Sequence, residues 1–327
     1  METLTSVPFD QRIDSMMQPV ASIASEFIFY SVNLFGSDIP LIVLWLIGGG
    51  LFFTFYLRFI NFRGFKHAID ILRGKFADPN DPGQISQFQA LTTAVSGTVG
   101  IGNIAGVAVA ISIGGPGATF WLIVAGLLGM STKLAECTLG VMYRRYEGGV
   151  VSGGPMYYLE KGLALRGWPR LGRSLGIFYA LSMVVGCLGI GNMFQSNQAA
   201  SILVSVTGGE SSIFADQLWV LGLVFAAAVG VVIIGGIKSI AATTARMVPG
   251  MALLYVLTAL IVITINWDKV PAAFVSIWVG AFAPEGVTGG LIGVMIIGFR
   301  RAVFSNEAGL GSAAIAHSTA RTREPVS

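Results

Sequence analysis

Residues 84–132 form a stretch of 49 residues that contains no Asp, Glu, Lys or Arg. A transmembrane helix needs about 20 consecutive apolar residues, so this stretch is long enough to cross a bilayer twice. The rest of the chain agrees, because only 11% of its 327 residues are charged, against about 25% in an ordinary soluble domain. These observations exclude a single water-soluble globule and predict an all-α protein that crosses the membrane several times.

The charge-free stretches divide the chain into seven predicted spans. The longest stretch is cut at residues 114–117, because the sequence Gly-Gly-Pro-Gly predicts a turn. Apolar residues recur at roughly helical spacing between residues 16 and 34, which predicts an amphipathic helix on the membrane surface. They are Met16, Val20, Ile23, Phe27 and Leu34. Residues 269–282 are too short to span and predict a re-entrant or interfacial helix. The seven predicted spans cover residues 39–57, 87–111, 116–142, 175–206, 217–236, 247–266 and 287–320.

The distribution of basic residues predicts the orientation of these spans. Of the 20 Lys and Arg residues, 15 lie in the tail and in the loops 58–85, 143–174 and 237–246. The alternate loops hold only Arg12 and Lys269. Because Lys and Arg accumulate in cytoplasmic loops, we expect the N-terminus outside and the C-terminus in the cytoplasm. Residues 1–38 are then a periplasmic amphipathic segment, followed by one transmembrane domain over residues 39–327.

Two predicted spans carry small and polar residues at mid-membrane, over residues 96–106 and 304–313. Gly costs about 1 kcal/mol relative to Ala inside a helix, so such clusters favour local unwinding. Unwound backbone in a membrane must line a cavity or be covered by protein. One Gly-rich segment is more typical of close helix packing, but two at matched positions favour a transport site. Exposed N–H groups there suit a carboxylate, and freed carbonyls suit Na+.

Three further polar residues in predicted spans each allow two interpretations. Gln195 needs a partner for its amide, which is either a neighbouring helix or a polar substrate. Glu136 is a site residue or the partner of Lys133, three residues earlier on the same helix. Glu307 is a site or gating residue or the partner of Arg300, about two turns away.

Four strings together resemble the alanine or glycine:cation symporter family: GTVGIGNIAGVAVA, GGPGATFWL, GNMFQSNQ and FSNEAGLGSAAIAH. The resemblance runs from about residue 40 to the end. It implies a carrier of the bacterial inner membrane that couples uptake of alanine or glycine to Na+. It also implies a leucine-transporter-like fold of five-plus-five inverted repeats in a lipid bilayer. Na+ is then the coupling ion, with no cofactor and no nucleic-acid partner.

The resemblance also implies roles for individual residues near the two interruptions. The implied substrate-binding residues are Thr98, Gly100, Gly102, Gln195, Phe304 and Asn306. The implied sodium ligands are the carbonyls of Ser96 and Val99, the side chain of Asn103, and Ser305.

The chain departs from the family in length. Family members continue through a second repeat, whereas this sequence ends at Ser327, just after the sixth core helix. We therefore expect a C-terminally truncated member, with an accessory span and core helices one to six. A non-transporting fragment or subunit and a passive channel remain alternatives. An enzyme is not expected, because the sequence contains no HExxH motif and no paired His and acid constellation.

Overall fold

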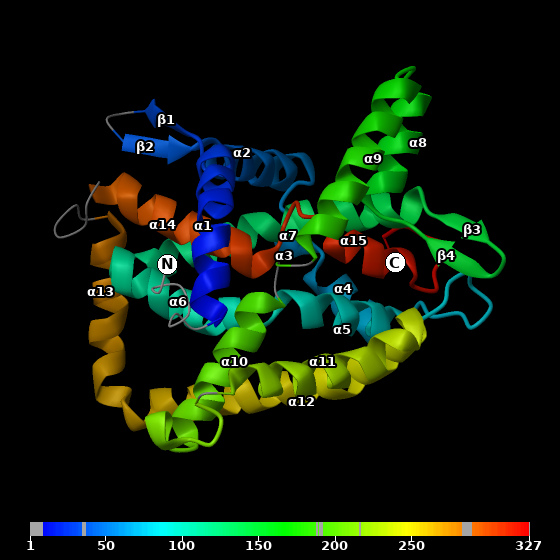
Figure 1. The fold of residues 1–327 in the computed structure, drawn as a ribbon. Coiled ribbons are helices and arrows are strands. Elements are labelled where there is room, and N and C mark those ends of the chain that lie inside the picture. The colour runs from blue at the N-terminus through cyan, green and yellow to red at the C-terminus, as the bar shows by residue number, and fades with distance from the viewer. Residues whose placement is uncertain are drawn as a thin grey trace.

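The computed structural model describes residues 9–34, 37–187, 189, 192–215, 217–282 and 290–326, and these residues are mostly helical (Figure 1). Two short antiparallel ribbons interrupt the helices: β1 (Ser31–Leu34) pairs with β2 (Ser37–Pro40), and β3 (Arg145–Glu147) pairs with β4 (Val150–Ser152). The helices are α1 (Phe9–Ile28), α2 (Leu41–Tyr56), α3 (Ile60–Arg63), α4 (Phe65–Leu72), α5 (Gln87–Thr98), α6 (Ile101–Gly114), α7 (Ala118–Met142), α8 (Pro155–Leu165), α9 (Pro169–Gly186), α10 (Met193–Val206), α11 (Leu218–Ile234), α12 (Gly236–Ile265), α13 (Val270–Phe282), α14 (Gly290–Asn306) and α15 (Ser312–Ser318).

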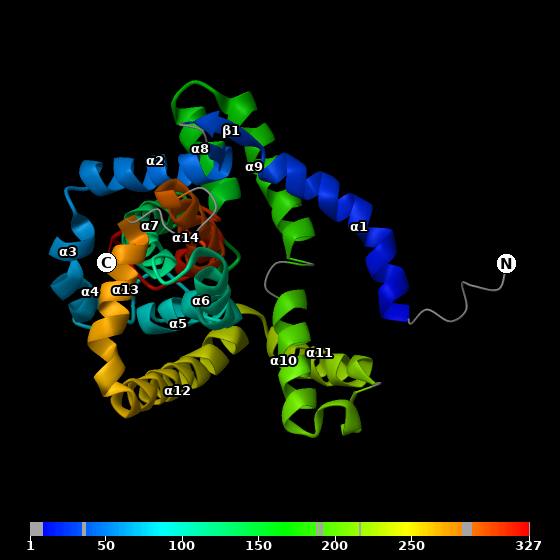
Figure 2. The same cartoon turned by 90° about the vertical axis from the view of Figure 1, so that its left-hand side faces the viewer.

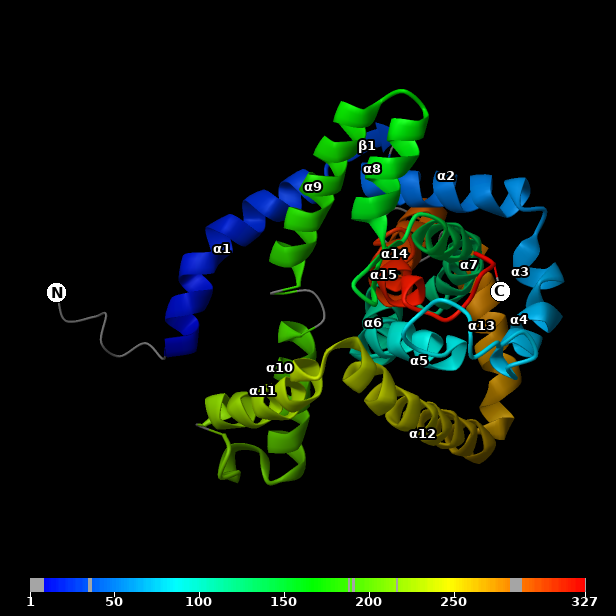
Figure 3. The same ribbon diagram turned by 90° about the vertical axis from the view of Figure 1, so that its right-hand side faces the viewer.

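Helix α7 lies at the centre of the fold. Helices α2, α6, α13, α14 and α15 all pack against it, and they surround it in Figures 2 and 3. Val43 of α2, Ala125 of α7 and Phe299 of α14 form one buried cluster where three of these helices meet. The start of α7 approaches α13 so closely that a Cβ on Gly117 would overlap the backbone of Gly280. The central helix is therefore fixed on several sides.

The two predicted interruptions are present, and the four half-helices pack in an antiparallel arrangement. The first divides α5 from α6, and the second divides α14 from α15. Helix α5 packs against α15, whereas α6 packs against α14. At one end of the pair, Gln84 N–H donates to Thr319 O (2.8 Å) and Arg321 N–H donates to Ile85 O (2.8 Å). The start of the first broken helix thus meets the end of the second.

Helices α10, α11 and α12 form an arm beside this bundle (Figure 3). Helix α12 packs against α5, α11 packs against α12, and α10 packs against α11. The predicted span over residues 175–206 is divided here between α9 and α10, and residues 188, 190 and 191 lie outside the described residues. The arm brings α10 to the side of the bundle where the first interruption lies.

Within the described residues, three helical segments are long and apolar enough to cross a membrane: Gln87–Gly114, Ala118–Met142 and Gly236–Ile265. Two shorter apolar helices are α2 and α11. Four of these segments match predicted spans to within a few residues. The fifth, α12, matches the span predicted at residues 247–266, but the loop predicted at residues 237–246 is wrong, because these residues belong to the same helix. The predicted short helix at residues 269–282 is α13. The predicted surface helix is α1, whose apolar side chains, such as Phe27 at 84% exposure, are uncovered. Its predicted extension to Leu34 is wrong, because α1 ends at Ile28 and Leu34 lies in β1.

Candidate functional site

The first interruption is two residues long and is held mainly by its own helix. Val99 and Gly100 are both extended, between the end of α5 and the start of α6. Gly100 N–H donates to Asn103 Oδ1 (3.0 Å), and Asn103 N–H donates to Gly100 O (3.0 Å). The amide oxygen of Asn103, an implied sodium ligand, therefore caps the start of α6 in this structure.

Polar side chains of α5 and α10 surround the first interruption. The hydroxyls of Ser96 and Thr98 donate to carbonyls one turn earlier, at 2.7 and 2.9 Å. Gly102 is buried in the first turn of α6. Gln195 of α10 lies beside Gly100, because a Cβ placed on Gly100 would be 2.9 Å from Gln195 Nε2. The structure thus places Gln195, an implied substrate ligand from the fourth predicted span, beside the first interruption.

The second interruption is longer and contains three residues in the left-handed region: Glu307 (φ +50°), Gly309 (φ +90°) and Gly311 (φ +83°). Two of these positions are Gly, which adopts this conformation without the strain that a Cβ brings. Asn306, the last residue of α14, begins the interruption, and Ser312 begins α15. The chain therefore leaves and re-enters the helical conformation within five residues.

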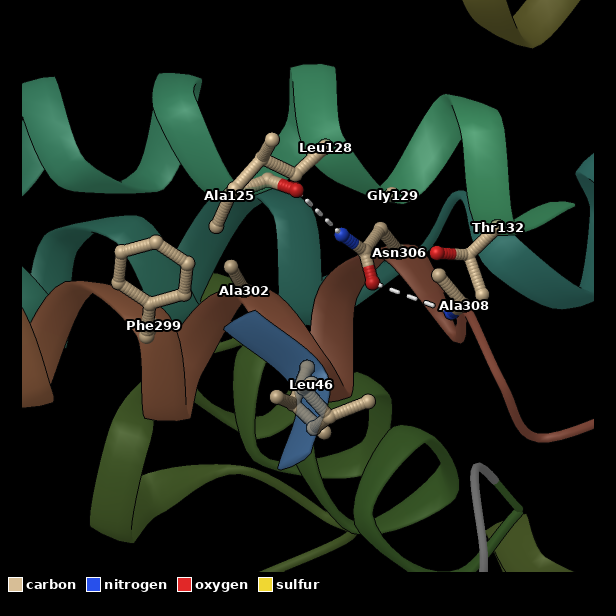
Figure 4. Close-up of a pocket in the computed structure, with 10 residues that line it drawn as sticks. Leu46, Ala125, Leu128, Gly129, Thr132, Phe299, Ala302, Asn306 and Ala308 are labelled. Carbon is tan, nitrogen blue, oxygen red and sulfur yellow. Dashed lines mark hydrogen bonds between the residues drawn. The ribbon is translucent and has the colours of Figure 1, made fainter. Parts of the chain in front are cut away.

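Asn306 anchors the start of the second interruption to α7 (Figure 4). Its Nδ2 donates to Ala125 O (3.4 Å), and its Oδ1 accepts from Ala308 N–H (3.1 Å). A cavity of about 30 Å³ lies beside this side chain, among residues of α2, α7 and α14. That volume is enough for a water molecule. It is too small for an amino acid, so Asn306 faces no substrate-sized space in this cavity.

Two charged residues of α7 hold the middle of the second interruption. Glu136 Oε2 accepts from Gly309 N–H (2.7 Å), and Glu136 Oε1 accepts from Gly311 N–H (3.3 Å). Lys133 Nζ donates to Glu307 O (3.1 Å). Within the described part of the chain, no ion pair joins Glu136 to Lys133. The interpretation of Glu136 as the partner of Lys133 is therefore wrong, because its carboxylate binds backbone N–H groups instead.

The side chain of Glu307 also has another partner than the sequence indicates. Its Oε2 accepts from Ser312 Oγ (2.9 Å), whereas the guanidinium of Arg300 lies 4.1 Å from the ring centre of Phe29. Pairing of Glu307 with Arg300 is therefore wrong. Ser305 lies in the last turn of α14, and the side chain of Phe304 falls outside the described residues.

A cavity of about 820 Å³ borders both interruptions. Ser96 and Gln195 line it near the first interruption, and Glu307, Leu310 and Ser312 line it near the second. Its other walls come mostly from α9, α10 and α11, which contribute largely apolar side chains. A few convergent polar groups in an apolar cavity of this size are typical of a small-molecule site. The volume far exceeds that of a small amino acid and does not by itself select one.

A model of the sodium:alanine symporter family matches residues 22–327. This chain belongs to that family. Members of the sodium:alanine symporter family are transporters and not enzymes, so the expectation that the chain is not an enzyme is confirmed. Family membership and the apolar helices together establish a multi-pass helical membrane protein.

Three relatives show how far the family similarity extends. An uncharacterized transporter of Haemophilus influenzae is 41% identical over 92% of this chain and 64% of its own length. The sodium/alanine symporter AgcS of Methanococcus maripaludis is 43% identical over 88% of this chain and 61% of its own length. The probable sodium/glutamine symporter GlnT of Bacillus subtilis is 36% identical over 88% of this chain and 57% of its own length. The chain thus spans about three-fifths of the length of these curated relatives.

One residue that joins the two broken helices, Arg144, could not be recognised from the sequence. Arg144, just after α7, is buried and donates to the carbonyls of Ser318 (2.9 Å), Ala320 (2.7 Å), Pro82 (3.1 Å) and Thr322. Burial lowers the pKa of its guanidinium. The side chain joins the start of the first broken helix to the end of the second. In the sequence, Arg144 is one basic residue among many in a predicted cytoplasmic loop.

Proposed function

We propose that this protein carries out sodium-coupled uptake of a small neutral amino acid, alanine or glycine, across the bacterial inner membrane. The observation that carries the proposal is that two antiparallel broken helices border one cavity with polar groups from both interruptions. In a leucine-transporter-like inverted-repeat fold, such half-helix ends face substrate and ion. Alternating access would then occur about these interruptions, with the N-terminus outside and the C-terminus in the cytoplasm.

The residues near the interruptions divide into three proposed roles. The first interruption offers N–H groups for the substrate carboxylate and carbonyls for Na+, and Gln195 approaches it from α10. Glu307, at the edge of the larger cavity, is the proposed gate. The proposed substrate ligands are Thr98, Gly100, Gly102, Gln195, Phe304 and Asn306, and the proposed sodium ligands are Ser96, Val99, Asn103 and Ser305.

The names of the relatives support sodium coupling more strongly than they support a single substrate. AgcS is named a sodium/alanine symporter, whereas GlnT is named a probable sodium/glutamine symporter. Both names contain sodium, but their amino acids differ in size. We therefore propose alanine or glycine on the resemblance, and competition between unlabelled alanine, glycine and glutamine is the measurement that ranks them.

Uptake by the purified chain in proteoliposomes tests the proposal. An inward Na+ gradient should drive accumulation of radiolabelled alanine, and replacement of Na+ by K+ should abolish it. Equal uptake in K+ would indicate a passive channel, and absence of both uptake and binding would indicate a non-transporting subunit. At equilibrium, Na+ should tighten alanine binding by the same factor by which alanine tightens Na+ binding, because linkage is reciprocal.

Two substitutions should separate ion binding from substrate binding at the first interruption. Asn103→Ala removes the amide oxygen beside Gly100, so apparent Na+ affinity should fall about tenfold, or about 1.4 kcal/mol, with a smaller loss of alanine affinity at saturating Na+. Gln195→Ala should instead lower alanine affinity more than apparent Na+ affinity. Asn197→Ala, which changes an exposed residue of α10 outside the cavity lining, is the control and should change neither affinity. Equal losses of both affinities in Asn103→Ala would indicate misfolding instead.

A further inference from the structure

The second interruption already holds a carboxylate and an ammonium, both supplied by α7. We propose that Glu136 and Lys133 are positioning residues that hold this interruption, and that Glu136 keeps the N–H groups of Gly309 and Gly311 from a substrate carboxylate, which is then received at the first interruption. Glu136 and Lys133 are three residues apart, which places them on the same face of α7. Both side chains reach across to the same segment, between residues 307 and 311.

Glu136 occupies two backbone N–H groups of the second interruption. Its two carboxylate oxygens each accept one backbone N–H of the interruption, from Gly309 and Gly311, and the residue is only 6% exposed. Hydrogen bonds to an ionised carboxylate are among the strongest in proteins. A substrate carboxylate would have to displace Glu136 to reach these N–H groups. These two N–H groups are therefore occupied by the protein itself.

Two carbonyl groups of the same segment also have side-chain partners. The carbonyl of Glu307 accepts from the ammonium of Lys133 (3.1 Å), and the carbonyl of Leu310 accepts from the hydroxyl of Tyr179 (2.9 Å). A freed carbonyl at the end of a helix is otherwise a ligand for a cation. Here a fixed ammonium takes that position at Glu307. The ammonium and the hydroxyl thus hold the backbone on either side of Gly309, whose N–H group binds Glu136.

The first interruption differs in each of these respects. Gly100 N–H is bound by Asn103, a neutral side chain of the same helix, and Gln195 is the side chain that lies beside it. A neutral amide oxygen is a weaker acceptor than a carboxylate, so an incoming carboxylate competes with it more easily. The asymmetry assigns reception of the substrate carboxylate to the first interruption and a positioning role to α7 at the second.

Chemical rescue tests whether the Glu136 carboxylate occupies the interruption. Glu136→Ala leaves the N–H groups of Gly309 and Gly311 unpaired and opens space for a small carboxylate. The purified variant in detergent should unfold at a lower temperature than the wild type. Formate should raise its unfolding temperature saturably, compared with chloride at the same ionic strength, and should have no such effect on the wild type.

Leu139→Ala is the matched control, because it removes side-chain volume from the same helix without leaving N–H groups unpaired. It should lower the unfolding temperature without any response to formate. A Glu136→Ala variant that responds to formate no more than Leu139→Ala does would overturn the proposal. Glu136→Gln keeps one acceptor oxygen and should fall between the wild type and Glu136→Ala, so stability equal to the wild type would also overturn it.

The consequence for transport rests on the function proposed above and is measured separately. If Glu136 positions the interruption without touching substrate, Glu136→Gln should lower the maximal uptake rate about fivefold and leave apparent alanine affinity within about twofold. A loss of alanine affinity at an unchanged maximal rate would place Glu136 against the substrate and contradict the proposal. If the wild-type chain shows no uptake, the proposed function fails while the rescue experiment still decides the role of Glu136.

Discussion

Replacement of Arg144 by Met should lower the free energy of unfolding by about 3 kcal/mol or more, because hydrogen bonds from a charged donor contribute about 1.5–3 kcal/mol each. The substitution removes the donor shared by four carbonyl oxygens on both sides of the contact between α5 and α15, and three of these hydrogen bonds are buried. Arg144→Lys should recover only part of the loss, since one ammonium cannot reproduce the planar fork of a guanidinium. Thermal or denaturant unfolding in detergent measures the effect.

The neighbouring residue provides a matched control for this substitution. Arg145 pairs with Glu160 at 3.2 Å, but both side chains are about 40% exposed. Exposed ion pairs contribute about 0–1 kcal/mol, so Arg145→Met should cost far less than Arg144→Met. Equal losses in the two variants would show that the carbonyl contacts of Arg144 do not stabilise the fold.

Gly311→Ala should have the second large effect and lower the free energy of unfolding by about 3 kcal/mol. Left-handed backbone strain contributes about 1–2 kcal/mol of this loss, and overpacking contributes about 1–3 kcal/mol. The residue has φ +83°, and an added Cβ would overlap the ring of Pro155 and lie 2.7 Å from the hydroxyl of Tyr179. Relief of that overlap would also disturb the hydrogen bond from Gly311 N–H to Glu136. The unfolding free energy of the purified variant measures the sum.

Gly148→Ala separates the two causes. Gly148 also has a positive φ, at +57°, but a Cβ there meets nothing within 4 Å. This variant should therefore show only the backbone strain, about 1–2 kcal/mol. If Gly311→Ala costs no more than Gly148→Ala, the close approach between the interruption and the start of α8 is not maintained in solution.

Local chemistry explains which features could be predicted from the sequence. The turn at residues 114–117 and both interruptions follow from Gly and polar residues whose effect on the backbone is exerted where they stand. The apolar stretches likewise mark α2, α7, α11 and α12 because length and hydropathy suffice to define them. The division between α9 and α10 was not predicted, although Gly186, Gly189 and Gly191 lie there, because such glycines also suit close packing of a continuous span.

The partners of charged residues could not be predicted, because they are backbone groups far away in the sequence. Glu136 binds N–H groups of Gly309 and Gly311, which carry no side-chain signal of that contact. Its neighbour Lys133 offers an obvious but incorrect partner at helical spacing. Arg144 binds carbonyls on both sides of the contact between residues 82–85 and residues 318–322, so nothing in its local sequence distinguishes it from the surrounding basic residues.

The backbone contact between residues 84–85 and 319–321 also sets the earliest point during synthesis at which the two broken helices can be joined. The start of α5 leaves the ribosome long before residues 319–321 do. Gln84, Ile85 and the side chain of Arg144 therefore lack these partners until the segment at the end of α15 has been synthesised. Contacts between such distant segments form late, because the loop that they close is long. A nascent chain that stops before residue 319 would therefore expose this end of the first broken helix to proteases and to membrane quality control.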